Sequence, residues 1–330
     1  MASFASNSIV RRQRRRRFLP VLTLVFVAAA AAAAQQSPSA RIAVLASSQP
    51  IYAGATDALA SQLRQAGFEC LVATLPDGDD AARRAVLDRV ESFKPSLVAT
   101  AGTAVTTTVT GALPEIPTLF FMVPNAPDVS PAGDGAAPGA CLGGVSSDPS
   151  PAHQMDWIRR SGPNCQRIAI LHSDRCLKTV QALEDAAQHA DLTIVRVAAA
   201  KDRFRDGLDS LAKSGCDGVL MIPDAQVYNA PNVQQLLLWG IRNKKPVWAF
   251  SENVVKAGAF AGQHADAANV GRTAATLIEQ VARSPRPAYV GVRYADAPSR
   301  SVNMRTAEII GADAGALQTD AQITPLGEQP

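Results

Sequence analysis

The stretch RIAVLASSQPIYAGATDALASQLRQAGFECLVAT, residues 41–74, decides the fold class. It begins with a short apolar run at 42–46, which is typical of a strand buried on both faces. A helix-patterned segment over about 51–66 follows and ends at Gly67, because glycine often terminates a helix. A second strand-like run covers 68–74. This strand, helix, strand order predicts a parallel sheet crossed over by helices.

The same alternation continues toward the C-terminus. Helices are expected over about 81–93 and 104–113, with strands at 96–100 and 117–123, which gives a first sheet of about four strands. Six prolines and several glycines interrupt the pattern over 124–151. We therefore expect no regular element in that segment, which would form a surface excursion and a hinge crossing.

Beyond residue 151 the pattern of the first half repeats. The expected helices are 152–160, 177–189, 202–213, 231–243, 267–282 and 303–310, and the expected strands are 167–171, 192–197, 217–222, 246–250 and 288–294. Two similar α/β units joined through a Pro/Gly segment predict two Rossmann-like lobes with parallel sheets around a cleft.

Four segments follow from this interpretation. They are a leader at 1–34, a first lobe at 41–146 plus 257–287, a second lobe at 147–256 plus 288–315, and a C-terminal tail at 316–330. The chain would cross between the lobes at hinges near 145–150, 251–257 and 286–290.

The N-terminal leader has the composition of a cleavable signal peptide. A basic cluster at 11–17 precedes an uncharged run from Phe18 to Ala34, which is short for a bilayer-spanning helix. We expect cleavage after Ala34, with Ala40 as an alternative, and no lipid anchor, because neither point is followed directly by a cysteine. The arginines fit both the general secretory and the twin-arginine routes.

Charge gives no indication of nucleic acid as a partner. The chain has a formal net charge of +3, but six arginines belong to the leader, so the remainder is near −3. Five cysteines without C-x-x-C spacing leave at least one thiol unpaired or paired with another chain. Cys70 and Cys216 are expected to be buried, and a disulfide among Cys141, Cys165 and Cys176 is compatible with an oxidising compartment.

No motif for a reaction, a metal or a cofactor is present in the sequence. P-loop, HExxH and GxSxG patterns are absent, and His153, His172, His189 and His264 lack metal-ligand spacing. We therefore expect a non-enzymatic chain that holds no cofactor and no metal.

Polar residues follow several predicted strands, where open parallel sheets bind ligands. Ser47 and Gln49 follow the first strand, Gly102 and Thr103 the third, and Asn125 the fourth. Glycine lets backbone approach a ligand, and we expect Thr103 to cap the next helix, whose N-terminus could hold a carboxylate. Ordinary helix capping without a ligand is the alternative interpretation.

The second half offers the opposing wall of the cleft. Asp224 follows an apolar strand and could pair with a ligand ammonium, with an Asx turn as the alternative. Ser251 follows the last strand of this half in the same manner. Trp248 lies within that strand, so we expect it in the core, although it could also join Tyr228 and Phe250 in an aromatic surface.

Several segments, in order along nearly the whole chain after the leader, resemble the substrate-binding proteins of ABC transporters, in particular the family whose best-known members bind tryptophan, tyrosine or related small molecules. The segments that carry the resemblance are 42–57 (IAVLASSQPIYAGATD), 97–104 (LVATAGTA), 116–128 (IPTLFFMVPNAPD), 142–145 (LGGV), 218–224 (GVLMIPD), 245–258 (KPVWAFSENVVKAG), Asn269 with Gly271, and 302–311 (VNMRTAEIIG).

The resemblance implies a type I periplasmic binding protein fold that closes on a small organic ligand, such as an amino acid, and delivers it to an inner-membrane ABC permease. It also implies a monomer located in the periplasm. The family's binding positions would fall here on Ser47, Gln49, Gly102, Thr103, Asn125, Asp224 and Ser251. A periplasmic sensor that signals to a membrane protein, and an exported α/β enzyme, are the alternatives.

Overall fold

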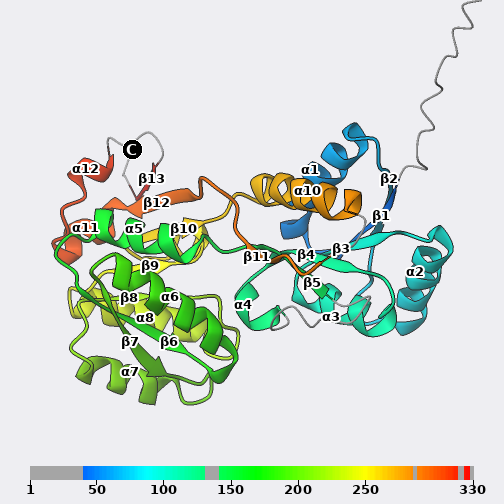
Figure 1. Cartoon of the computed structure of the whole chain (residues 1–330). Coiled ribbons are helices and arrows are strands. Elements are labelled where there is room, and N and C mark those ends of the chain that lie inside the picture. Colours follow the sequence, from blue (N-terminus) through cyan, green and yellow to red (C-terminus); the bar gives the residue numbers. More distant parts are fainter. Residues whose placement is uncertain (1–39, 131–140, 285–287, 319–322, 328–330) are drawn as a thin grey trace, which may run out of the picture. The chain divides into compact units, whose positions relative to one another are not determined.

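The structure is a computed structural model that describes residues 40–130, 141–284, 288–318 and 323–327. Its helices and strands form two α/β units (Figure 1). Each unit is built around one sheet, and we call these units the first and the second lobe.

The sheet of the first lobe has the order β11-β5-β4-β3-β1-β2. All of its neighbouring strands are parallel, and Ile42 lies beside Cys70 on one side and Leu97 on the other. The strands are β1 (Arg41–Ala46), β2 (Glu69–Thr74), β3 (Leu97–Ala101), β4 (Thr118–Val123), β5 (Cys141–Ser146) and β11 (Gly291–Arg293).

Helices cover both faces of this sheet. Helices α1 (Ala53–Gln65) and α10 (Ala267–Arg283) lie side by side on one face, as Figure 1 shows, and share a core with Ile42, Val44 and Phe121. Helices α2 (Asp80–Phe93) and α3 (Thr103–Ala112) bury their apolar residues against the other face. The continuous apolar strands therefore have the two-sided burial that the sequence predicted.

The sheet of the second lobe has the order β13-β12-β10-β9-β8-β6-β7. The pairing of β10 with β12 is antiparallel, and the other pairings are parallel. The strands are β6 (Arg167–His172), β7 (Thr193–Ala198), β8 (Gly218–Leu220), β9 (Val247–Ala249), β10 (Ala261–His264), β12 (Ser299–Asn303) and β13 (Ile323–Leu326).

Two helical layers enclose this second sheet. One face packs against α5 (Pro151–Ser161), α6 (Leu177–His189) and α11 (Met304–Ile310), and the other against α7 (Phe204–Lys213), α8 (Ala230–Arg242) and α9 (Glu252–Lys256). The first five strands of each lobe have the same order across the sheet. Numbered along the chain within the lobe, this order is 5-4-3-1-2. This is a doubly wound arrangement, repeated once.

The strand pairings correct the expected domain limits. Strand β10 pairs with β9 and β12, so residues 261–264 belong to the second lobe and not to the first. Strand β11 pairs with β5, so residues 291–293 belong to the first lobe. The chain therefore crosses between the sheets at 147–150, as expected, but then at 265–266 and 294–298 and not at 251–257 and 286–290.

Two segments for which no element was predicted contain helices and strands. Helix α4 (Ala126–Val129) and strand β5 lie within 124–151. Strand β5 was not recognised because Gly143 and Gly144 interrupt its apolar pattern, yet both are required, since a Cβ at either would overlap the backbone of Gly291 or Phe120. In the tail, α12 (Gly315–Gln318) precedes β13, which extends the second sheet beside β12.

Candidate functional site

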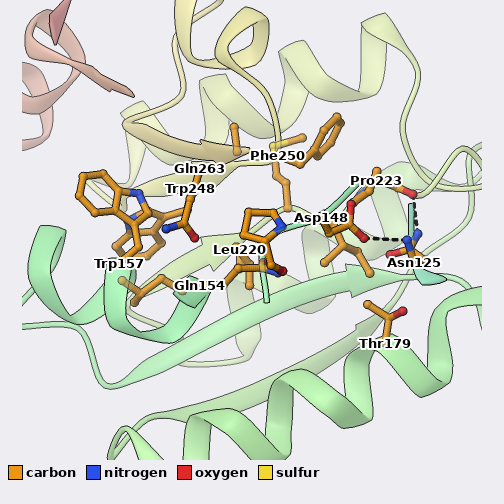
Figure 2. A pocket seen from close by; sticks show the side chains of 15 residues that line it. Asn125, Asp148, Gln154, Trp157, Thr179, Leu220, Pro223, Trp248, Phe250 and Gln263 are labelled. Carbon is orange, nitrogen blue, oxygen red and sulfur yellow. Dashed lines mark hydrogen bonds between the residues drawn. The ribbon is translucent and has the colours of Figure 1, made fainter. Parts of the chain in front are cut away.

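A pocket lies where strands of both sheets end (Figure 2). The first lobe contributes Asn125, just beyond β4, and Asp148, just beyond β5. The second lobe contributes the ends of β8 and β9 and side chains of α5 and α6. Its cavity volume is only about 20 Å³, which is room for one or two water molecules.

Asn125 reaches from the first lobe to the second. Its backbone adopts a left-handed conformation with φ of 47°, which asparagine tolerates better than most residues. Its side-chain Nδ2 donates to the carbonyl of Pro223 at 2.6 Å and to Sγ of Cys176 at 3.4 Å. Its Oδ1 is buried and has no hydrogen-bond partner. Asn125 thus joins the lobes and leaves one acceptor available.

Asp148 is a carboxylate without a compensating cation in the pocket. Its Oδ2 accepts a hydrogen bond of 2.7 Å from the backbone N–H of Asn125, and its own N–H donates to Oγ of Ser146 at 3.0 Å. Burial raises the pKa of Asp148 to about 6, which its hydrogen bonds only partly oppose. The negative charge of Asp148 also helps to raise the pKa of Tyr294 to about 12, although burial of Tyr294 is the larger cause.

Aromatic side chains form the other end of the pocket. Figure 2 shows Trp157 and Trp248 there, away from Asp148 and Asn125. The indole Nε1 of Trp248 donates to Oγ of Ser161 at 2.7 Å, whereas the Nε1 of Trp157 is buried without a partner. The guanidinium of Arg300 lies 5.5 Å from the ring centre of Trp157, in cation–π geometry. The Nε1 donor of Trp157 is therefore left unsatisfied within the protein.

Two amides lie between the charged and the aromatic end. Nε2 of Gln154 donates to the carbonyl of Pro149 at 2.9 Å. The amide of Gln263, oriented by its neighbours, donates to the carbonyl of His153 at 3.2 Å and accepts from Nε of Arg300 at 3.3 Å. These bonds fix both amides, so the pocket is a pre-organised set of polar atoms in an apolar wall.

The comparisons with known proteins identify the family. Residues 42–313 match the family described as ABC transporter substrate binding protein. The chain belongs to this family. No curated protein matches the chain.

Solved structures of similar proteins agree with a type I periplasmic binding protein fold. An ABC domain from Streptococcus pneumoniae in complex with L-Trp has 21% identity and a TM-score of 0.57, with coverage of 86% of this chain and 99% of that one. A substrate binding protein with adhesive properties from Clostridium difficile, in a ligand-free, open structure, has 16% identity, a TM-score of 0.66 and coverage of 88% and 100%. A conserved domain protein from Vibrio cholerae has 17% identity, a TM-score of 0.60 and coverage of 87% and 99%. At these identities the likeness is one of fold.

Four of the expected binding residues of this ABC substrate-binding protein lie at the carboxyl edge of the first sheet, outside the lining of the pocket. Oγ of Ser47 accepts from the backbone N–H of Gln49 at 3.4 Å, and Gln49 is exposed. Gly102, with φ of 81°, lies against the ring of Tyr52. Thr103 is exposed and does not cap α3 as expected, because Gly102 occupies the N-cap position and Thr103 is already helical.

The two expected residues of the second lobe are engaged with its own backbone. The carboxylate of Asp224 accepts from the N–H groups of Ser173 at 2.8 Å and Gln226 at 2.9 Å, the second being the Asx-turn alternative. Oγ of Ser251 caps α9 by accepting from the N–H of Val254 at 3.4 Å. Of the seven expected positions, Asn125 is the one that lines the pocket.

Sequence reasoning missed most of the residues that line this pocket. Asp148 was missed because it follows β5, the strand concealed by glycines. Gln154 and Trp157 stand three residues apart on α5, a spacing that places both on one helix face. That spacing is the signal that could have indicated them. Thr179 and Gln263 carry no comparable signal, since neither follows a predicted strand.

All five cysteines are free, so the disulfide considered among Cys141, Cys165 and Cys176 is not formed, and Cys70 is only half-buried. No cluster of His, Cys, Asp or Glu in the described ranges could hold a metal ion. Among the helices the structure describes, none has the length and apolarity to cross a bilayer.

Proposed function

We propose that this chain is the periplasmic solute-binding component of an ABC uptake transporter and binds a small organic ligand of about amino-acid size between its lobes. The observation that carries the proposal is the pocket of Figure 2, where Asn125 of the first lobe and Trp157 and Thr179 of the second contribute buried polar atoms that have no partner in the protein. Such atoms are costly unless a ligand or water satisfies them. Family membership supports the same role.

The proposed location depends on the leader. The basic and apolar halves of residues 1–34, which lie outside the described residues, favour export with cleavage near Ala34. Because the residue directly after the cleavage point is not a cysteine, the protein would diffuse freely in the periplasm as a monomer and deliver its ligand to an inner-membrane permease. The ligand would leave the protein chemically unchanged, because the role is binding and not catalysis.

The proposed closing movement brings the remaining expected residues to the ligand. Asn125 already lines the pocket, while Ser47, Gln49, Gly102 and Thr103 lie at the same carboxyl edge of the first sheet. Asp224 and Ser251 lie at the corresponding edge of the second sheet. Rotation about the three crossing segments would allow these two edges to approach each other.

Thermal unfolding of the purified protein against a panel of amino acids, monoamines, carboxylates, sugars and nucleosides tests this proposal. A true ligand at 100 times its Kd stabilises the folded protein by about 2.7 kcal/mol. Recovery of the hit unchanged after incubation distinguishes binding from turnover, and a strain without the protein should lose uptake of the labelled hit. A panel without any hit, or a hit that is consumed, would contradict the proposal.

A further inference from the structure

We propose that the small cavity of Figure 2 binds one alkali-metal cation, held by oxygen atoms of Asp148, Asn125 and Thr179. Asn125 belongs to the first lobe and Thr179 to the second, so the cation would bridge the lobes. Three observations carry the proposal: two buried oxygens without partners, a carboxylate without a cation beside them, and the size of the cavity.

The two oxygens without partners line the cavity from opposite lobes. Asn125 and Thr179 are each only 8% exposed, and neither Oδ1 of Asn125 nor Oγ1 of Thr179 has a hydrogen bond within the described structure. They do not bond to each other, so a further group is needed to satisfy both. Nδ2 of Asn125 donates to the carbonyl of Pro223 at 2.6 Å, which fixes Oδ1 as the atom left without a partner.

Asp148 adds a negative charge beside these oxygens. Figure 2 draws its side chain next to Asn125, whose backbone N–H donates to Oδ2 of Asp148 at 2.7 Å. Among the described residues, no Lys, Arg or His lines the cavity. The surroundings are also negative, because burial raises the pKa of the nearby Cys176 thiol and the charges of three carboxylates raise it further, those of Asp224, Asp128 and Asp148. Within the described part of the chain, none of the three forms an ion pair.

An alkali-metal cation matches the cavity in size, charge and ligand type. The volume of about 20 Å³ holds one or two waters, and therefore an ion of similar size, but not a solute of amino-acid size. Sodium and potassium ions, like other hard cations, take oxygen ligands. A water molecule could satisfy the two free oxygens, but it would leave the buried carboxylate without a compensating charge.

A divalent ion fits this donor set less well. Calcium takes about six to eight oxygens, often from several carboxylates, and magnesium keeps several waters. Asp148 is the one acidic residue in the described lining, and a hydrated ion has no room there. The described residues contain no cluster of His, Cys, Asp and Glu of the kind that holds zinc or calcium. One carboxylate, one amide oxygen and one hydroxyl therefore favour a monovalent ion.

Unfolding of the purified protein in chloride salts of equal ionic strength tests the site. The salts are those of sodium, potassium, calcium and choline, since choline is too large for the cavity. We expect sodium or potassium to stabilise the folded protein over choline with a saturable dependence, and 100 times the Kd should raise the folding equilibrium constant about hundredfold. Equal stability in sodium, potassium and choline chloride would mean that water alone fills the cavity, and would overturn the proposal. A larger effect of calcium would overturn the monovalent assignment.

Variants separate a bound cation from general effects of salt. Asp148→Asn removes the charge and should weaken the apparent cation affinity at least tenfold. Thr179→Val should weaken it severalfold, whereas Thr179→Ser keeps the hydroxyl and should resemble the parent protein. Asp156→Asn, on the exposed side of α5, is the matched control and should keep the full salt effect. An undiminished salt effect in folded Asp148→Asn would contradict the assignment.

Crystals of the parent protein in rubidium chloride give a check that needs no variant. Rubidium has an anomalous signal and the same charge as sodium and potassium. A peak in contact with Asp148, Asn125 and Thr179 would support the site, and a water without anomalous signal at that position would overturn it.

The cation should also favour the approach of the lobes and, with it, solute binding. This link rests on the proposed function. Isothermal titration of a solute hit should give an affinity about fivefold higher or more in sodium or potassium chloride than in choline chloride, and no such difference in Asp148→Asn. Equal affinities for the parent protein would contradict the link. A salt effect on unfolding without any solute hit would overturn the proposed function and leave the cation site standing, whereas a hit without any salt effect would do the reverse.

Discussion

The carboxylate of Asp128 accepts a 2.9 Å hydrogen bond from the backbone N–H of Thr179. It accepts a second, of 2.8 Å, from the N–H of Lys178, so a residue of the first lobe caps α6 of the second. The N-cap residue of α6, Cys176, makes no side-chain capping bond of its own. The helix start that presents Thr179 to the pocket therefore depends on a contact between segments 50 residues apart.

Replacing Asp128 with alanine should destabilise the folded protein by about 1 kcal/mol, because two N–H groups at the start of α6 lose their acceptor and the helix dipole loses a favourable charge. Equilibrium urea unfolding measures the loss. The free energy of unfolding of Asp128→Asn should lie between those of the parent protein and Asp128→Ala. Asp156→Ala, at an exposed position of α5, should change it by no more than about 0.5 kcal/mol. Equal stability of Asp128→Ala and the parent protein would contradict the capping role.

The capping of α6 illustrates what the sequence could and could not predict. The helix itself was expected at 177–189, as observed, because its apolar spacing is local. Its cap was not, because a carboxylate supplied from another lobe leaves no trace in the neighbouring residues. The alternation of strands and helices likewise predicted both doubly wound sheets, since that pattern depends only on periodicity.

The pocket was predicted less well than the fold, because its residues are brought together by contacts between distant segments that leave no local pattern in the sequence. The rule that ligands bind beyond strand ends indicated Asn125, which lines the pocket. It could not indicate Asp148, because β5 is a strand through close backbone contacts of its glycines and not through apolar side chains. Nor could it show that Asp224 uses its carboxylate on the N–H groups of Ser173 and Gln226.

The hydroxyl of Ser161 should stabilise the folded protein because it accepts a hydrogen bond from Trp248. Both side chains are buried, and Nε1 of Trp248 donates to Oγ of Ser161 at 2.7 Å. Ser161→Ala leaves this donor buried without an acceptor, which should cost about 1 to 3 kcal/mol in urea unfolding. Ser210→Ala is a close control, because Ser210 is exposed and its hydroxyl, like that of Ser161, donates to the carbonyl four residues earlier. Similar losses in both variants would show that the indole bond is unimportant.

Two glycines on facing helices should respond differently to alanine. Gly271 of α10 packs directly on α1, where a Cβ would overlap the carbonyl of Ala55, so Gly271→Ala must move the helices apart. We expect a net loss of about 1 to 3 kcal/mol despite the higher helix propensity of alanine. At Gly54 of α1 a Cβ would lie 3.9 Å from Cβ of Ala267, an ordinary contact. Gly54→Ala should leave the free energy of unfolding unchanged or raise it slightly, and a loss as large as that of Gly271→Ala would contradict the packing argument.

Asp148 should give the stability of the unliganded protein a distinctive pH dependence. Burial raises its pKa in the folded state to about 6, above the usual value of 3.8, so the folded protein binds this proton more tightly than the unfolded chain. The stabilisation of the folded state by this proton is therefore complete below about pH 4 and is lost as the pH rises to about 6. Tyr294 and Cys176 interact electrostatically with Asp148, but both stay protonated over this range because burial raises their pKa values. The loss should amount to about 1 to 3 kcal/mol, since Asp148 is partly solvated.

Other groups titrate in the same range, so the informative quantity is the difference between the parent protein and Asp148→Asn. Asparagine cannot ionise, and its Oδ1 can still accept from the N–H of Asn125. The variant should therefore be the more stable protein at pH 7, with an advantage that shrinks as the pH falls toward 4, because the parent carboxyl then becomes neutral as well. Urea unfolding at half-unit steps from pH 4 to 7.5 measures both curves, with Asp156→Asn as the exposed control. Parallel curves for the parent and Asp148→Asn would mean that folding does not raise the pKa of this carboxyl, and would contradict the prediction.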